Sequence, residues 1–267
     1  MTDDASQKSP STHGHGGHGH GGHGAEPKPL DLRERGLPID GKPQFLDRRL
    51  FMQLLVFRAP GVRGAYKAIE ALHAAMLHEN VPGVIYEDVN DPQGIALLSW
   101  SEDPSDFVTK VRPLFALDGL ADLVFRPEMT MTGRTYSSGF ENDLEFWLLR
   151  RPVETALHEG WDFAVWYPLR RLGSYYQLPP QEQAAILREH GGIGRAYGEL
   201  DLAHDIRLAC HGVDANDNEF LVSLIGKELY PLSHVVQAMR VTKQTSQYMQ
   251  QMGPFFVGHA VRRNRGR

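Results

Sequence analysis

An order of apolar segments that occurs twice along the chain constrains the fold most. In each half, strand-like and helix-like apolar patterns follow one another as β-α-β-β-α-β, which is typical of the ferredoxin-like unit. The first copy is predicted as strands at 50–58, 83–88, 94–100 and 123–136 and helices at 62–80 and 104–117. The second copy is predicted as strands at 161–169, 206–211, 219–225 and 254–261 and helices at 180–189 and 232–248.

Two copies of one pattern with little sequence identity indicate a structural duplication. Two such sheets can merge into one β-barrel with the helices outside, which removes exposed sheet edges. We therefore expect an α+β fold of the dimeric α+β barrel type, in which regular structure begins near Arg49. The expected parts are a disordered His/Gly-rich tail at 1–43, a first repeat at 44–136, a connector at 137–160 with a short helix at 144–150, and a second repeat at 161–267.

Composition excludes several classes of protein. The formal net charge of -5 argues against a general nucleic-acid binder, which usually has a basic excess. Cys210 is the one cysteine, so neither an intramolecular disulfide framework nor a Cys-based zinc site is expected. No apolar run reaches the roughly 20 residues of a membrane span, and the polar start lacks the apolar core of a signal peptide. We expect a soluble cytoplasmic protein.

The tail contains the low-complexity run HGHGGHGHGGHG at 13–24. Imidazoles on a flexible backbone bind Ni(II), Cu(II) or Zn(II), so a metal site is one interpretation of this run. A disordered tail with incidental metal affinity is the other, because Gly and His offer no apolar face to bury. The run accounts for five of the 13 histidines of the chain: His13, His15, His18, His20 and His23.

The stretch from Trp161 to Gly198 gathers oxidisable and cationic side chains. Strand alternation places Tyr167 on one face with Phe163, Val165 and Leu169, and a core tyrosine with a bonded hydroxyl is the plain interpretation. His190 lies near the end of the next helix, which Gly191-Gly192 is expected to stop. A single histidine serves as the axial ligand of heme iron, or is favoured at a helix C-terminus by the macrodipole.

Several arginines accompany these two residues. Guanidinium groups bind carboxylates bidentately, so a cofactor with several carboxylates needs such groups around its rim. Solvated surface cations are the alternative. The arginines in question are Arg150, Arg151, Arg170, Arg171, Arg195 and Arg240.

Four short motifs in the second half also occur in a known order. They are Tyr167-Pro168, the run HGGIGRAY at 190–197, Met239-Arg240, and the run GPFFVG at 253–258. With these motifs the second half resembles the chlorite dismutase superfamily, and within it the coproheme decarboxylases, which are hydrogen peroxide-dependent heme synthases. The first half agrees only in its order of strands and helices.

The resemblance implies a homopentamer of two-repeat subunits that binds heme or iron coproporphyrin III (coproheme). It implies that His190 is the proximal ligand of the heme iron and that Tyr167 is the redox-active tyrosine. The remaining cofactor-binding residues that it implies are Arg151, Arg195, Arg240, Thr245 and Tyr176.

The sequence also departs from the family's pattern on the distal side. Chlorite dismutases carry a distal arginine where counting from His190 places Ala203, which disfavours chlorite decomposition. Arg171 stands where the decarboxylases often have lysine, and Tyr175 replaces a common tryptophan. Arg150 stands at the position of a distal histidine, so the group that handles the peroxide proton is left open between Arg150, His158 and another residue. The catalytic candidates are Tyr167, Arg171 and Arg150.

The expected activity is peroxide-dependent oxidative decarboxylation of iron coproporphyrin III, which turns propionates into vinyl groups and yields heme b. Tyr167 would carry the radical that removes hydrogen from a propionate. A heme-dependent peroxidase or peroxide sensor of the same fold is the first alternative. A non-enzymatic heme or metal carrier is the second. The natural porphyrin and the number of subunits stay open.

Overall fold

The first repeat is built from apolar strands that alternate their side chains between two faces. A computed structural model describes residues 29–267. The histidine run at 13–24, for which a metal site is one of two interpretations, lies outside the described residues. The strands are paired in the order β7-β3-β5-β4, as expected for a ferredoxin-like unit. The elements are β3 (Phe51–Arg58), α1 (Val62–His78), β4 (Gly83–Asp88), β5 (Gly94–Ser101) and β7 (Met131–Arg134).

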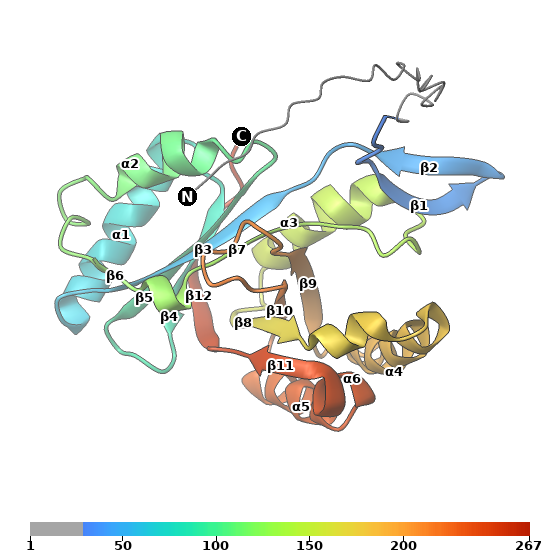
Figure 1. The fold of residues 1–267 in the computed structure, drawn as a ribbon. Helices are drawn as coiled ribbons and strands as arrows, with labels where there is room; N and C mark the ends of the chain where they lie inside the picture. The colour runs from blue at the N-terminus through green and yellow to red at the C-terminus, as the bar shows by residue number, and fades with distance from the viewer. Residues whose placement is uncertain (1–28) are drawn as a thin grey trace, which may run out of the picture. The chain divides into compact units, whose positions relative to one another are not determined.

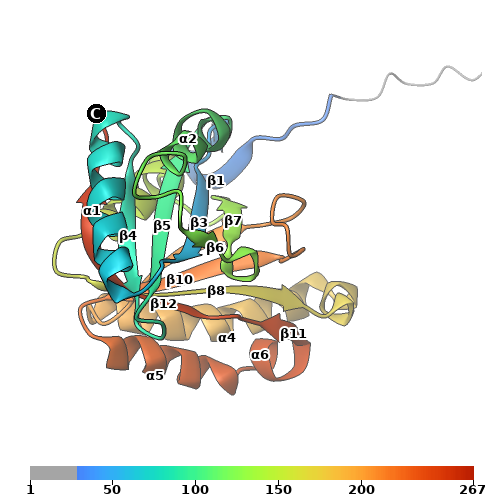
Figure 2. The same cartoon turned by 90° about the vertical axis from the view of Figure 1, so that its left-hand side faces the viewer.

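The second repeat follows the same topology, with strand order β9-β10-β8-β12. Figures 1 and 2 show its two long helices on one side of these strands. The elements are β8 (Phe163–Arg171), α4 (Pro180–Glu199), β9 (His204–Ala209), β10 (Phe220–Gly226), α5 (Leu229–Arg240) and β12 (Phe256–Asn264). The prediction of an α+β fold with two ferredoxin-like repeats is confirmed.

The two sheets join into one closed circuit of strand pairs. β12 pairs with β4 on one side, β9 meets β7 at the pair Arg134–Ala209 on the other, and β8 pairs with both β10 and β12. Apolar side chains from both repeats, including Leu54, Trp166 and Phe256, pack inside this circuit. Two further clusters lie outside it, one under α1 and the other under α4 and α5.

Residues 34–46 form a β-hairpin that the sequence analysis missed. β1 (Glu34–Ile39) pairs with β2 (Lys42–Leu46), so the prediction of a tail over 1–43 and of order beginning near Arg49 is wrong for this segment. Asp40 and Gly41 both have positive φ, 50° and 74°, as the two-residue turn of a tight hairpin requires. The side chain of Gln44 donates to the carbonyl of Glu141, which ties the hairpin to the connector.

Prolines explain three further differences in the first half. Pro127 cannot donate a ladder hydrogen bond, and the strand predicted at 123–136 is interrupted there. The helix predicted at 104–117 is reduced to a π turn and one short α-helical turn, which contains Pro113. The helix predicted at 144–150 continues instead, because Pro152 is tolerated in a first helical turn. The elements are β6 (Val124–Phe125), η2 (Pro127–Met129), η1 (Phe107–Val111), α2 (Arg112–Leu114), η3 (Phe146–Arg150) and α3 (Arg151–Leu157).

Two helices of the second half also end elsewhere than predicted. Gly191-Gly192 does not stop α4, which continues to Glu199. Each glycine costs a helix about 1 kcal/mol relative to alanine, and the packing of Ile193 and Tyr197 under the sheet offsets that cost. The helix predicted at 232–248 breaks at Thr242, whose hydroxyl accepts from the backbone N–H of Thr245 and begins a new helix. The remaining elements are η4 (Gly173–Gln177), α6 (Lys243–Tyr248) and β11 (Met249–Met252), which pairs with β8.

None of the helices described in residues 29–267 is long and apolar enough to cross a membrane.

Substitutions inside the closed circuit of strand pairs should destabilise the protein most, because side chains of both repeats are buried there. Leu54 is fully buried among side chains of both repeats, so Leu54→Ala should lower the free energy of unfolding by about 2–5 kcal/mol. Leu77→Ala, at a leucine of α1 that is 53% exposed, is the matched control and should change it by less than about 0.5 kcal/mol. Urea unfolding followed by circular dichroism measures both. Equal losses for the two variants would contradict the assignment of the core.

Candidate functional site

One face of the second sheet carries Tyr167 together with charged residues. Val222 of β10 lies opposite Tyr167 of β8 and also opposite Arg207 of β9, and Leu224 is likewise opposite Val165 and Asp205. Directly opposed residues of antiparallel strands point to the same side of a sheet. We call this side, with Val165, Tyr167, Leu169 and Leu224, the site face. It is covered by α4 and α5.

Tyr167 is held firmly on the site face. It is only 3% exposed, and its ring stacks on Phe255 with the centroids 4.8 Å apart. The predicted alternation with Val165 and Leu169 is confirmed, because all three belong to the cluster under α4 and α5. Burial raises the pKa of the Tyr167 phenol, and the charge of Asp205 raises it further while that of Arg240 opposes it. The phenol therefore keeps its proton at neutral pH.

His190 faces the same space from α4. Residues three, four and seven positions after it, Ile193, Gly194 and Tyr197, lie on the same stripe of the helix. Ile193 and Tyr197 pack into the cluster of the site face, and a Cβ placed on Gly194 would lie 3.5 Å from the Met239 methyl carbon. The His190 side chain is therefore directed toward the sheet that carries Tyr167.

The surroundings of His190 favour a neutral ring. Burial lowers its pKa, and the charges of Arg171 and Arg207 act in the same direction against the opposing charge of Glu189. Its Nδ1 lies 3.4 Å from the hydroxyl oxygen of Thr242, and that hydroxyl donates to the Met239 carbonyl at 2.8 Å. An oxygen whose proton is already engaged can only accept from Nδ1–H, which leaves the lone pair on Nε2. Neutral imidazole is the form that ligates metals.

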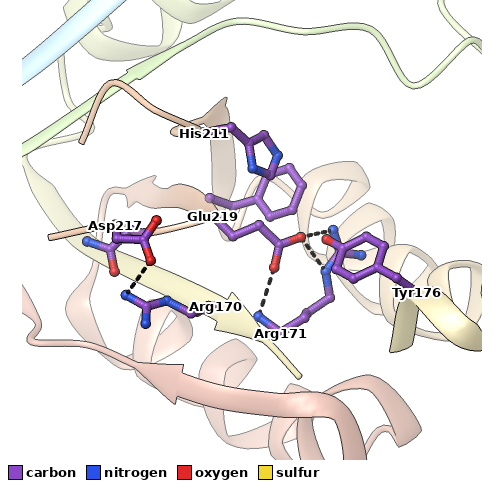
Figure 3. A pocket seen from close by; sticks show the side chains of 8 residues that line it. Arg170, Arg171, Tyr176, His211, Asp217 and Glu219 are labelled. Atoms are coloured by element: carbon purple, nitrogen blue, oxygen red, sulfur yellow. Dashed lines mark hydrogen bonds and ion pairs between the residues drawn. The ribbon is translucent and has the colours of Figure 1, made fainter. Parts of the chain in front are cut away.

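Arg171 is held by a carboxylate that sequence reasoning did not find. Its Nε and Nη2 donate to Oε1 of Glu219 at 2.9 and 2.6 Å, and its backbone N–H donates to Oε2 at 2.8 Å (Figure 3). Both side chains are less than 10% exposed. The guanidinium also lies 4.4, 4.6 and 5.3 Å from the ring centroids of Tyr175, Phe220 and Tyr176. Arg171 is thus fixed in position and paired.

An open cavity of about 490 Å³ lies beside this pair. Figure 3 shows that side chains from the end of β8 and from the segment between β9 and β10 converge on it. His211 contacts Phe220 edge-on at 5.4 Å at its wall, and burial together with Arg134 and Arg171 lowers the pKa of His211. The lining residues are Arg170, Arg171, Tyr176, His211, Asp217, Asn218, Glu219 and Phe220.

A second charged group stands at the β9 border of the site face. Arg151 reaches from α3 and donates from Nη1 to the backbone carbonyl of Asp205 and from Nη2 to its Oδ1, both at 2.8 Å. Arg207 places its Nε 2.9 Å from the other oxygen, Oδ2. Burial works against ionisation of Asp205, but the charges of Arg207 and Arg151 outweigh it and lower the pKa of the carboxyl group.

The structure brings some predicted site residues together and leaves others apart. Arg240 is close enough for its charge to act on Tyr167, and Thr245 lies 3.4 Å from the Thr242 hydroxyl that contacts His190. Tyr176 is half-exposed at the cavity beside Arg171. Arg195 is exposed on α4, outside the stripe that carries His190.

The two groups considered for the distal proton lie elsewhere. Arg150 is 55% exposed and pairs with Asp143 at 3.1 Å, and no interaction within residues 29–267 links it to Tyr167 or His190. His158 stacks on Trp161 with the ring centroids 3.7 Å apart, and Trp161 stacks equally closely on His204. Their roles in proton transfer stay predictions.

Sequence reasoning missed three charged residues of the site: Asp205, Arg207 and Glu219. A signal existed for the first two. Ile206 and Leu208 point into the core, so Asp205 and Arg207, which alternate with them, must face the other side. Glu219 gives no such signal, because its partner Arg171 is 48 residues away in the chain.

The structure is an α+β fold of two ferredoxin-like repeats, in which His190 of α4 faces the sheet of the second repeat. A family model described as chlorite dismutase matches residues 116–261, which is more than half of the chain. The chain therefore belongs to the chlorite dismutase family.

Solved structures show the same fold at low sequence identity. A heme-binding protein from Thermus thermophilus is 18% identical over 81% of this chain and 92% of its own, with a TM-score of 0.63. A chlorite dismutase variant from Candidatus Nitrospira defluvii in complex with cyanide is 12% identical over the same shares, also with a TM-score of 0.63. The complex of that organism's chlorite dismutase with imidazole gives 13% identity, 81% and 93% coverage, and a TM-score of 0.62.

The buried ion pair predicts a large effect on stability. Glu219→Gln keeps the shape of the side chain but leaves Arg171 as a buried charge without its counter-ion, so the free energy of unfolding should fall by about 3–5 kcal/mol. Asp217→Asn, on the same segment but 91% exposed, is the matched control and should stay within about 0.5 kcal/mol of the parent. Urea unfolding at pH 7 measures both. A Glu219→Gln variant as stable as the control would show that the pair is dispensable.

Proposed function

We propose that this protein binds an iron porphyrin through Nε2 of His190 and uses hydrogen peroxide to decarboxylate iron coproporphyrin III to heme b. The observation that carries the proposal is the placement of a neutral His190 over the sheet face that presents Tyr167. Membership of the chlorite dismutase family and the fold shared with a heme-binding protein support it.

The residues present fit such a cofactor. The structure offers one imidazole with a free lone pair, which suits an axial ligand of porphyrin iron. Arg171, Arg207 and Arg240 carry positive charge close to His190 or Tyr167, as the propionates of a porphyrin require. A Cβ on Gly191 or Gly192 would meet nothing within 4 Å, so protein packing does not demand these glycines. Both glycines are exposed on α4 next to His190 and leave the helix surface there without side chains.

A bound iron porphyrin supplies the oxidising equivalents that peroxide delivers. Tyr167 then gives up an electron together with its phenolic proton, because its raised pKa disfavours the phenolate. The neutral phenoxyl radical takes a hydrogen atom from the β-carbon of a nearby propionate. The propionate would then pass a second electron to the remaining oxidising equivalent from peroxide and release carbon dioxide, so that a vinyl group forms and Tyr167 is again a phenol. Overall, one peroxide and one proton are consumed for each propionate, and carbon dioxide and water are released.

The arginines orient the substrate in this scheme and do not exchange protons. A guanidinium stays protonated at all working pH values, and Arg171 is moreover held by Glu219. Arg171 therefore contributes a fixed positive charge near His190, whose pKa it lowers. Arg240, at the end of α5, is a second positive charge that acts on Tyr167.

A heme-dependent peroxidase or peroxide sensor of the same fold is the second candidate. The Arg171–Glu219 pair favours it, because an arginine that already binds a carboxylate is less able to grip a propionate. Mass analysis of the porphyrin after incubation with peroxide separates the two activities. Decarboxylation gives a vinyl product of lower mass, whereas a peroxidase oxidises an added reductant and leaves the porphyrin unchanged.

Tyr167→Phe tests the radical step. The substitution keeps the stacked ring but removes the abstractable hydrogen, so conversion of iron coproporphyrin III should fall to the level seen without protein, while porphyrin binding persists. Conversion is measured by mass spectrometry and binding by absorbance. Tyr230→Phe, on α5 and 74% exposed, is the control and should convert at the parent rate. Parent-rate conversion by Tyr167→Phe would refute the proposed mechanism.

His190→Ala tests the ligand assignment. Loss of the imidazole should weaken binding of iron coproporphyrin III and change the absorbance spectrum of the bound iron. The control His78→Ala replaces a histidine that is 83% exposed on α1 and should bind like the parent. If His190→Ala bound with parent affinity and an unaltered spectrum, another residue would have to be the ligand.

A further inference from the structure

Arg207 lies on the same face of the sheet as Tyr167, two strands away. It lies in one row with Val222 and Tyr167 across β9, β10 and β8, and all three side chains point to the site face. Two strand spacings separate the Cα atoms of Arg207 and Tyr167 by about 10 Å. Both side chains rise from the site face at that separation, which is the distance that a propionate bound between them has to bridge.

Among the three arginines that contact Asp205 or Glu219, Arg207 keeps its binding edge free. Arg151 uses both of its terminal nitrogens on Asp205, and Arg171 uses Nε and Nη2 on Glu219. Arg207 contacts Asp205 through Nε only, and within the described part of the chain neither of its terminal nitrogens bonds a protein group. A guanidinium with two free terminal N–H groups matches a carboxylate bidentately.

Arg207 lies at a recess in the protein surface. Its side chain is 49% exposed, yet burial is the largest influence on its pKa, ahead of the opposing charge of Asp205. Arg207 lines a small recess together with Tyr136, Glu141, Trp147 and Arg151. Its charge reaches His190, which places that space on the α4 side of the sheet.

Asp205 holds Arg207 in this position without cancelling the local positive charge. Two arginines share the single carboxylate, which leaves a net charge of +1 on the group Arg151–Asp205–Arg207. Glu141 lines the same recess and its charge acts on Arg207, but its carboxylate oxygens accept hydrogen bonds from Ser137 and Ser138. The carboxylate contacts Nε of Arg207 at 2.9 Å and leaves both terminal nitrogens of the guanidinium available.

We propose that Arg207 binds the carboxylate of the propionate that Tyr167 attacks, and thereby selects porphyrins that still carry this group. The inference rests on the proposed function and names a substrate-specificity residue within it. Because decarboxylation removes the group that Arg207 grips, Arg207 favours the substrate over the product. It thus binds iron coproporphyrin III, which has four propionates, in preference to iron protoporphyrin IX, which has two.

Absorbance titration of the full chain with each of these two iron porphyrins tests the inference. Arg207→Leu should weaken binding of iron coproporphyrin III by about tenfold or more, as expected for loss of a charge-assisted hydrogen-bonded pair. Binding of iron protoporphyrin IX should change by less than about twofold, because the partner carboxylate is absent from it. Arg207→Lys keeps the charge without the bidentate edge and should recover part of the difference.

Arg188→Leu is the matched control, since it removes the same charge from an exposed arginine of α4. It should leave both affinities unchanged. Equal weakening of both porphyrins by Arg207→Leu, or no weakening of either, would overturn the role of Arg207 while leaving the proposed function intact. If the parent protein bound neither porphyrin, the proposed function itself would be wrong and this inference with it. Urea unfolding of Arg207→Leu confirms that any loss comes from a folded protein.

Discussion

The two-residue periodicity of β8 is the constraint on which the site depends. Trp166 points into the core shared by both repeats, and Tyr167, the next residue, points to the site face under α4 and α5. β8 pairs with β10 on one side and with β12 and β11 on the other, so its register is fixed along both edges. A slip by one residue would exchange the two faces and bring Trp166 to the position that Tyr167 occupies.

Charge pairing then divides the arginines into structural and binding groups. Arg171 is buried, flanked by aromatic rings and matched by Glu219 on two sides, so its charge is satisfied within the protein. Arg207 is half-exposed and shares one carboxylate with Arg151, which leaves both charge and donors available. Arg171 and Arg207 therefore differ in the charge and donors that they leave available, and the difference comes from the carboxylates that they contact.

Sequence periodicity predicted the elements that form the site but not all of its contacts. The strand with Tyr167 and the helix with His190 follow from local patterns, as does the order of both repeats. The Asp40-Gly41 turn signal was present and was outweighed by the polar composition around it. Glu219 could not be predicted, because its pairing with Arg171 arises only when β8 and β10 come together. The same holds for Arg151 and Asp205, which belong to α3 and β9.

The wrongly predicted end of α4 shows how local propensity and site chemistry compete. Gly191 and Gly192 are poor helix formers, and a local interpretation ends the helix at His190. The helix continues because Ile193 and Tyr197, one and two turns further on, are packed under the sheet. No neighbouring atom lies close enough to exclude a side chain at Gly191 or Gly192. Packing within the chain therefore does not explain why these two positions are glycine. Residues with low helix propensity that the packing of the protein does not require are expected at functional sites. There, ligand binding rather than helix stability determines which residue is present.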